Sequence, residues 1–125
     1  VIVQIETEAA LGELEAIAAV DGVDAIFVGP ADLSGSMGLT GQINHPRVMK
    51  AMADAARRCR ALGKPVGSIG VELEVMAQYR AAGYDYLAIN SDLGLFVQAA
   101  QRSIAALRGR DTEHVHDLAG GTREA

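Results

Sequence analysis

Hydrophobic residues recur along this chain in two alternating patterns. Four short apolar runs of strand length occupy residues 1–6, 24–28, 65–69 and 85–90. Each is followed by a longer segment in which apolar residues recur every three or four positions, at residues 8–19, 46–62, 72–82 and 92–107. The short runs predict strands and the longer segments predict amphipathic helices. Because strand and helix alternate throughout, we expect a parallel sheet with helices outside it.

Residues that favour helix ends mark the limits of these predicted helices. Thr7 is placed to cap the first helix, and Pro46 suits the first turn of the second. Gly63 and Gly83 follow the second and third helices, where glycine commonly ends a helix. Between the second strand and Pro46, residues 29–44 contain four glycines and are predicted to form a long loop. A loop of that length inside a compact domain is usually functional.

A short internal repeat supports a division into equivalent units. Gly22-Val-Asp24 precedes the second strand and Gly83-Tyr-Asp85 precedes the fourth, and an Asp-Leu pair follows each of these strands. Four strand–helix units of about 30 residues are half of an eight-unit barrel, whose usual size is about 250 residues. We therefore predict the α/β class and the C-terminal half of a (β/α)8 TIM barrel. The predicted barrel domain spans residues 1–109, and residues 110–125 are expected to form a polar, mobile tail.

The first strand favours this half-barrel over a free-standing, four-stranded flavodoxin-like sheet, which stays an alternative. Gln4 and Glu6 share one face of the strand, opposite the all-apolar face. Polar residues suit the mouth of a barrel better than the first strand of an isolated small sheet. The chain also opens inside a strand, at Val1, and is therefore expected to be a fragment whose missing half precedes it.

Composition narrows the classes of function. The 125 residues are 50% hydrophobic with a net charge of −5, which favours a soluble cytoplasmic domain that binds no nucleic acid. Arg57, Arg58 and Arg60 are accordingly interpreted as a solvated or subunit-facing surface. No apolar run approaches the roughly 20 residues that span a bilayer, so no membrane association is expected. The single cysteine, Cys59, falls in a helical pattern and is expected to pack there.

Two carboxylates follow the first two predicted strands. Glu6 ends the first strand, and Asp32 follows the second in a glycine-rich segment. The carboxyl ends of parallel strands meet at one edge of the sheet, where α/β enzymes hold their active sites. A hard divalent cation needs oxygens delivered side by side, so this pair is the predicted metal site. A plain strand-end carboxylate at Glu6 and a helix cap at Asp32 are the simpler interpretations, but they explain the pair less well.

Five segments carry a further signal when they are taken together: Val3-Gln-Ile-Glu6-Thr7, Gly29-Pro-Ala-Asp32-Leu-Ser34, Asn44-His-Pro46, Gly63-Lys-Pro-Val-Gly67 and Asn90-Ser-Asp92-Leu. They resemble the C-terminal half of the HpcH/HpaI aldolase family, from Val1 to about Leu107. Gln-x-Glu combined with Gly-Pro-Ala-Asp-Leu-Ser is specific, whereas either motif alone would be weak. The family contains class II pyruvate aldolases that act on 4-hydroxy-2-oxoheptanedioate, 2-keto-3-deoxy-L-rhamnonate or 2-dehydro-3-deoxyglucarate.

The resemblance implies a barrel that is hexameric when complete and in which Glu6 and Asp32 ligate Mg²⁺, Mn²⁺ or Co²⁺. It implies cleavage of a 4-hydroxy-2-oxo acid to pyruvate and an aldehyde. The family's catalytic histidine and carbonyl-binding arginine come from the N-terminal half, which this sequence does not include. The alternatives are a lyase of the citrate lyase β or malyl-CoA type and a non-catalytic half-barrel that serves as a binding or assembly module.

The chemistry of this cleavage assigns roles to the second segment. Retro-aldol cleavage develops an enolate on the pyruvate half, and a divalent cation stabilises that charge as a Lewis acid. The backbone N–H groups of Ala31 and Asp32 lie in the turn after the second strand, together with Gly29 and Pro30. We expect this turn to bind the substrate carboxylate.

The remaining polar candidates lie outside this turn. Gln4 is the expected catalytic residue that orients water or the keto oxygen, with a purely structural place in the barrel as the alternative. Ser68, on the third strand, is expected either to touch substrate or to pack as a small residue. His45 is interpreted as a helix cap, and His114 and His116 as residues of the polar tail.

Overall fold

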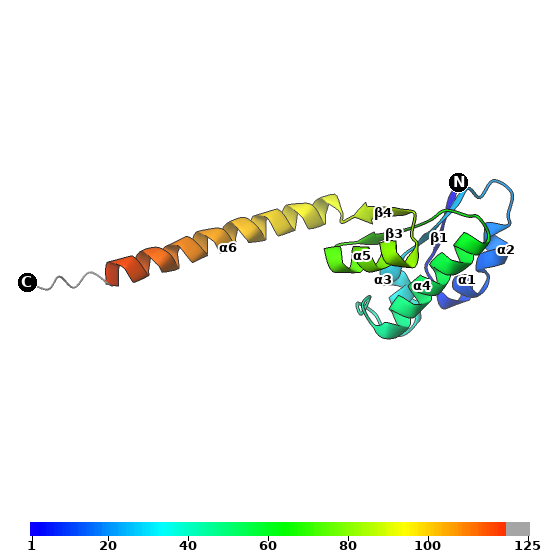
Figure 1. Cartoon of the computed structure of the whole chain (residues 1–125). Coiled ribbons are helices and arrows are strands. Elements are labelled where there is room, and N and C mark those ends of the chain that lie inside the picture. Colours follow the sequence, from blue (N-terminus) through cyan, green and yellow to red (C-terminus); the bar gives the residue numbers. More distant parts are fainter. Residues whose placement is uncertain (120–125) are drawn as a thin grey trace, which may run out of the picture. The chain divides into compact units, whose positions relative to one another are not determined.

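A computed structural model of the chain describes the backbone of residues 1–119 and the side chains of residues 1–109. The chain forms two compact units, Val1–Ile89 and a second unit that begins at Asn90. The first unit holds a sheet and five helices, and the second holds one long helix (Figure 1). Each unit is described by itself below.

The sheet of the first unit consists of four parallel strands. They are β1 (Ile2–Ile5), β2 (Ala25–Val28), β3 (Val66–Gly70) and β4 (Tyr86–Ile89). Their order in the sheet is β1-β2-β3-β4, which is also their order in the chain, and every neighbouring pair is parallel. The predicted strands are confirmed, and a helix lies between each strand and the next, as in a half TIM barrel.

The main helices of this unit begin and end where the sequence predicts. Helix α4 (Pro46–Ala61) starts at the proline, and the His45 side chain accepts a hydrogen bond of 3.2 Å from the Arg47 N–H at its N-terminus. Helix α5 (Leu73–Ala82) ends at Gly83, whose φ of 103° is in the left-handed region that glycine adopts without strain. The cap predicted at His45 is confirmed.

The first predicted helix is interrupted. It consists of α1 (Glu8–Gly12) and α2 (Leu14–Ala18), separated at Glu13, where the backbone leaves the helical region. Thr7 caps α1 by accepting a 3.0 Å hydrogen bond from the Ala10 N–H. Gly12 stands directly before the break, and glycine weakens a helix because its backbone loses the most conformational freedom on folding.

The prediction of an uninterrupted loop over residues 29–44 is wrong, because this segment contains α3 (Pro30–Ser36). Proline occupies the first helical position, where its missing N–H costs no hydrogen bond. The hydroxyls of Ser34 and Ser36 donate to the carbonyls of Ala31 and Leu33 at 2.6 and 2.8 Å. Leu33 is fully buried, so tertiary packing outweighs the low helix propensity of the glycine and serine residues.

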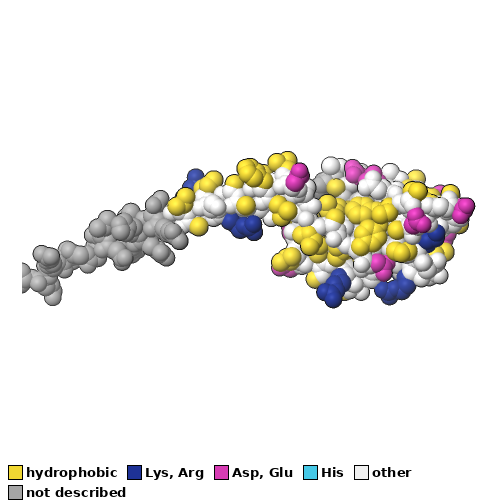
Figure 2. All heavy atoms as spheres, turned by 90° about the horizontal axis from the view of Figure 1, so that it is seen from above, with side chains coloured by type: hydrophobic (Ala, Val, Ile, Leu, Met, Phe, Trp, Pro, Cys, Tyr) yellow, Lys and Arg dark blue, Asp and Glu magenta, His cyan; other side chains and the backbone are white. Residues whose placement is uncertain are grey.

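The two faces of the sheet differ in what covers them. Ile5, Ile26, Val28 and Val66 are buried in the core that the helices form with one face. Residues between them in the sequence, such as Phe27, point to the opposite face because strand side chains alternate. Seen from above, hydrophobic side chains gather in the middle of the unit (Figure 2). The second face corresponds to the interior of a barrel, which further strands would close.

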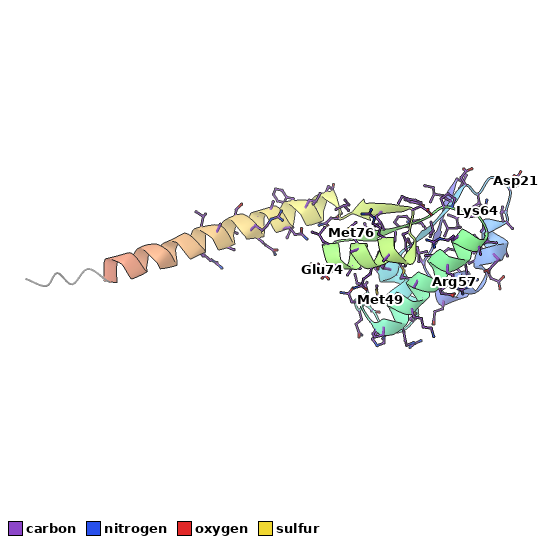
Figure 3. All side chains as sticks on the ribbon, viewed as in Figure 1. Asp21, Met49, Arg57, Lys64, Glu74 and Met76 are labelled. Carbon is purple, nitrogen blue, oxygen red and sulfur yellow. The ribbon has the colours of Figure 1, made fainter. Side chains whose placement is uncertain are left out.

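One of the arginines predicted to lie on the surface joins α4 to both α1 and α2 instead. The Arg58 guanidinium donates to the Glu15 carboxylate at 2.7 Å from Nε and to the Leu11 carbonyl at 2.8 Å from Nη1. Arg58 is 19% exposed. Its hydrogen bonds lower the pKa of the Glu15 carboxyl to about 2. Arg57, on the outer side of α4, is exposed as predicted (Figure 3).

The second unit is the helix α6 (Asp92–Ala119). The predicted amphipathic helix over residues 92–107 is expected to bury its apolar side, but Leu93, Phe96, Ile104 and Leu107 are exposed in this chain. An apolar helix stripe is buried only where another element covers it, and in this chain α6 forms a separate unit. The helix continues past residue 109, and the rest of the predicted tail lies outside the described residues. None of the described helices is long and apolar enough to span a membrane.

We expect the 125-residue chain to self-associate when it is produced alone. In the described residues β1 and β4 each pair on one side only, and unpaired strand edges recruit other strands. Ile2→Lys should reduce the association, because this residue is exposed on β1 and a lysine disfavours edge pairing. Sedimentation velocity measures the association of the unaltered chain and of the Ile2→Lys variant. A monodisperse monomer with cooperative thermal unfolding would contradict this expectation.

Candidate active site

The carboxyl ends of β1 and β2 bring Glu6 and Gly29 together. The register pairs Ile5 with Val28, so the next residue of each strand lies alongside the other. The Gly29 N–H donates to the Ile5 carbonyl at 3.1 Å. A Cβ atom at Gly29 would lie 3.0 Å from both Cγ and Oε1 of Glu6. The Glu6 side chain therefore lies directly against the Gly29 backbone, where a larger residue would crowd the carboxylate.

Asp32 lies three residues beyond this contact, in the first turn of α3. Its side chain is exposed, whereas that of Glu6 is half-buried. The sequence prediction placed Asp32 in a loop, and the helix instead fixes its backbone. First-turn N–H groups such as those of Ala31 and Asp32 have no partner within their own helix. The same turn thus offers a carboxylate and backbone N–H donors at the carboxyl ends of the strands.

Gln4 occupies the strand face on which the barrel interior would form. Its register partner is Phe27, and it is exposed in this chain. Gln4 and Glu6 are two residues apart, so they share one face of the chain as it leaves β1. The structure thus places the predicted residues Gln4, Glu6, Gly29 and Asp32 along the ends of two adjacent strands.

Ser68 differs from the other predicted site residues. It is fully buried, and its hydroxyl donates to the Val28 carbonyl at 2.8 Å. Its register partner is Val28, a core residue on the helix-covered face. This placement favours the packing interpretation of Ser68 over contact with substrate.

Several other groups are placed away from these strand ends. Cys59 is buried in the core, and burial raises the pKa of its thiol to about 11, which suits packing rather than nucleophilic attack. Lys64 lies at the amino-terminal end of β3, near the turn that holds Asp21 (Figure 3), and its ammonium donates to the Val23 carbonyl. The side chains of His114 and His116 lie outside the described residues.

Within the described residues no cluster of three or more histidine, cysteine, aspartate or glutamate side chains could hold a metal. Glu6 and Asp32 are instead two carboxylates that follow adjacent strands, one at the end of β1 and one in the first turn of α3. Two carboxylates leave most of the coordination shell of a hard cation to water and substrate oxygens, which is how proteins commonly bind Mg²⁺. The donor set fits such an ion, and the Gly29 backbone leaves room for one of its carboxylates.

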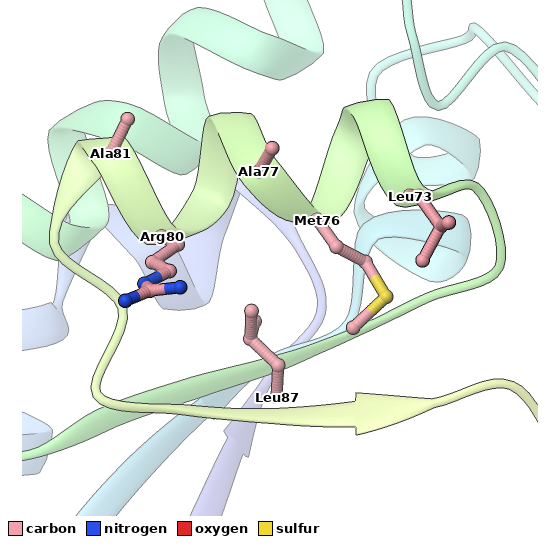
Figure 4. Close-up of a pocket in the computed structure, with 6 residues that line it drawn as sticks. All are labelled: Leu73, Met76, Ala77, Arg80, Ala81 and Leu87. Carbon is pink, nitrogen blue, oxygen red and sulfur yellow. The ribbon is translucent and has the colours of Figure 1, made fainter.

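A groove on the other face of the sheet is separate from these residues. It lies between α5 and β4 and is lined by Leu73, Met76, Ala77, Arg80, Ala81 and Leu87 (Figure 4). Leu87 alternates with Tyr86 along β4 and therefore points away from the face that carries Tyr86. The groove belongs to the helix-covered side and is not part of the candidate active site.

The sequence interpretation missed one feature next to the site. Tyr86 lies across Gly67, where a Cβ atom would collide with its ring, and its hydroxyl donates to the Ile26 carbonyl at 2.8 Å. Gly67 and Tyr86 stand at matching positions of adjacent parallel strands. A glycine inside a predicted strand was the available signal, because it often marks the close approach of another group.

Comparisons with known proteins identify the family of this chain. The HpcH/HpaI aldolase/citrate lyase family matches residues 1–99. A 2-dehydro-3,6-dideoxy-6-sulfogluconate aldolase of Pseudomonas putida is 44% identical over 87% of this chain and 43% of its own length. A 5-keto-4-deoxy-D-glucarate aldolase of Enterobacter sp. (strain 638) is 41% identical over 82% of this chain and 40% of its own.

Solved structures show the same arrangement. A HpcH/HpaI aldolase/citrate lyase family protein from Burkholderia cenocepacia J2315 has a TM-score of 0.80 and 38% identity over 86% of this chain and 42% of its own. The citrate synthase SbnG has a TM-score of 0.78 and 27% identity over 89% of this chain and 45% of its own.

The chain is a member of the HpcH/HpaI aldolase/citrate lyase family. It has the α/β fold of the C-terminal half of a TIM barrel, and the predictions of family and fold class are confirmed. Its relatives are lyases of the aldolase type. The chain spans about two fifths of the length of the curated relatives cited above.

We expect Gly29→Ala to displace the Glu6 carboxylate, because the new Cβ atom would lie 3.0 Å from Glu6 Cγ and Oε1. Gly35→Ala is the matched control, since the nearest atom to its Cβ would be the Thr40 hydroxyl at 3.8 Å. Crystal structures of the two variants, made in a complete barrel that carries this sequence, measure the Glu6 rotamer. A Glu6 side chain that keeps its position beside Ala at 29 would contradict the contact.

Proposed function

We propose that this chain is the metal-binding half of a divalent-metal-dependent pyruvate aldolase. The complete enzyme would cleave 4-hydroxy-2-oxo acids, of the 2-keto-3-deoxy sugar acid or 4-hydroxy-2-oxoheptanedioate type, to pyruvate and an aldehyde. One observation carries this proposal: the Glu6 carboxylate lies against Gly29, and Gly29 is three residues before Asp32. The names of the relatives support the substrate class.

Each residue of the site has a defined task in this proposal. Glu6 and Asp32 would hold Mg²⁺, Mn²⁺ or Co²⁺. The bound cation would supply Lewis-acid stabilisation of the enolate charge that develops on pyruvate. Gln4, on β1 and two residues before Glu6, would donate its amide N–H to water or to the keto oxygen.

The turn at the start of α3 would bind the other end of the pyruvate unit. The backbone N–H groups of Ala31 and Asp32 are first-turn donors, which favour an anionic acceptor. Gly29 and Pro30 shape this turn, and the buried ring of Pro30 fixes the direction in which the helix begins. In this arrangement the carboxylate of the substrate meets α3 while its keto oxygen lies toward Glu6.

The residues proposed above include neither the general base nor the group that binds the substrate carbonyl. We expect them from barrel strands other than the four described.

We also propose a cytoplasmic homo-oligomer, a hexamer when complete, by extension of the family resemblance. A lyase that acts on citrate-like or acyl-CoA substrates is the second candidate, because the citrate synthase SbnG shares this half-barrel. A half-barrel that only binds or assembles is the third.

We expect Mn²⁺ binding to a complete barrel carrying this chain to depend on both carboxylates. Glu6→Gln and Asp32→Asn should each weaken binding by at least about tenfold, or roughly 1.4 kcal/mol, because each leaves the cation one charged ligand short. Glu13→Gln and Asp21→Asn are the controls, since they remove the same charge from exposed positions elsewhere. Titration calorimetry measures all four. Unchanged affinity in either site variant would place the metal elsewhere.

We expect the same barrel to release pyruvate from a 4-hydroxy-2-oxo acid, to lose this activity in EDTA and to regain it with Mn²⁺ or Mg²⁺. Borohydride with pyruvate should not inactivate it, because neither lysine of this chain lies at the carboxyl ends of the strands. Lys50 is exposed on α4, and Lys64 precedes β3. A coupled pyruvate assay follows the reaction.

Three other outcomes would count against the proposed aldolase. Activity that survives exhaustive chelation and is lost with borohydride would require a lysine-based mechanism. Cleavage of an acyl-CoA thioester substrate, without cleavage of the hydroxy-oxo acid, would favour the second candidate. Mn²⁺ binding without cleavage of either substrate class would favour a binding or assembly module.

A further inference from the structure

The sheet face that carries Gln4 holds an aromatic layer directly beneath the candidate site. The register places Gln4, Phe27, Gly67 and Tyr86 in one row across β1, β2, β3 and β4. Because the side-chain period of a strand is two, Glu6 heads the next row toward the carboxyl ends on this face. Any group fixed in the aromatic row therefore supports the residues that surround the Glu6 carboxylate.

Tyr86 links two strands that are not neighbours. Its hydroxyl donates to the Ile26 carbonyl at 2.8 Å, although β3 lies between β4 and β2. Gly67 makes this possible, since a Cβ atom there would collide with the Tyr86 ring. The ring also lies against Phe27, with centroids 6.3 Å apart and planes at 39°. One side chain thus spans β3 and holds β2 by a hydrogen bond and an aromatic contact.

The strand that Tyr86 holds leads straight into the candidate site. Gly29, against which the Glu6 carboxylate lies, comes three residues after Ile26 and two after Phe27, and α3 with Asp32 follows it. We propose that Tyr86 is a positioning residue for the two-carboxylate site, which keeps the carboxyl end of β2 in place relative to Glu6. This inference rests on the proposed function, because it assigns the pair to a divalent cation.

Tyr84 serves as a control for Tyr86, because its hydroxyl also donates to a backbone carbonyl, but to one of α4 rather than of β2. The Tyr84 hydroxyl donates to the Met52 carbonyl at 3.0 Å, so it is also a tyrosine O–H bonded to the backbone. Met52 lies on α4 within the helix-covered core. Removing this hydroxyl costs a comparable hydrogen bond on the opposite side of the sheet.

The test compares Tyr86→Phe with Tyr84→Phe in a complete barrel that carries this sequence. Mn²⁺ affinity is measured by titration calorimetry, with thermal unfolding as the readout of stability. Tyr86→Phe should weaken Mn²⁺ binding by about tenfold, the effect usual for groups that orient metal ligands. Tyr84→Phe should lower the unfolding temperature to a similar degree and leave Mn²⁺ affinity within about twofold, since its partner is far from the metal ligands in the fold.

A second variant approaches the same contact from β3. Gly67→Ala should displace the Tyr86 ring and weaken Mn²⁺ binding as Tyr86→Phe does. Equal Mn²⁺ affinity in Tyr86→Phe and Tyr84→Phe, with Glu6→Gln still weakened, would overturn the role of Tyr86 and leave the proposed function intact. Mn²⁺ binding that is insensitive to Glu6→Gln would overturn both.

Discussion

The arrangement of this half-barrel depends on the parallel pairing of β1 with β2. Four consecutive register pairs end at Ile5 and Val28, and this register decides which residues meet beyond the strands. Glu6 then lies beside Gly29, where the absence of a side chain leaves room for the carboxylate. A shift of one residue would turn the side chains of a whole strand to the other face and move Glu6 away from Gly29.

The helix-covered face holds this pairing in place. Ile5, Ile26 and Val28 are buried beneath the helices, and burial of such side chains contributes about 1.5–3 kcal/mol each. Arg58 ties α4 to α2 through Glu15 and to α1 through the Leu11 carbonyl. Because the pKa of Glu15 is lowered to about 2, this carboxylate stays ionised, and the contact stays intact, until the pH falls toward that value.

Much of this could be predicted from the sequence because it depends on local patterns. The four strands, the caps at Thr7 and His45 and the glycine end of α5 follow from periodicity and end preferences. It could also be predicted that Glu6 and Asp32 follow adjacent strands at one edge of the sheet, because the carboxyl ends of parallel strands share an edge. The contact of the Glu6 carboxylate with Gly29 could not be predicted, since it depends on the register of β1 with β2.

The features that the sequence did not predict depend on tertiary contacts. Helix α3 forms in a segment of low helix propensity because Leu33 is buried. The Tyr86 link crosses an intervening strand, which no periodicity describes. Ser68 is a polar residue on a strand, as a site residue would be, but its register with Val28 places its side chain on the helix-covered face of the sheet. The apolar stripe of α6 was predicted correctly as a pattern, but a stripe does not specify what covers it.

The central claim is that Glu6 and Asp32 together hold one divalent cation. Anomalous diffraction from Mn²⁺ soaked into crystals of a complete barrel carrying this chain tests this most directly. We expect a single Mn²⁺ peak at the carboxyl ends of β1 and β2, within direct bonding distance of carboxylate oxygens of both residues. A Mn²⁺ peak bound by other residues, or contact with only one of these two carboxylates, would contradict it.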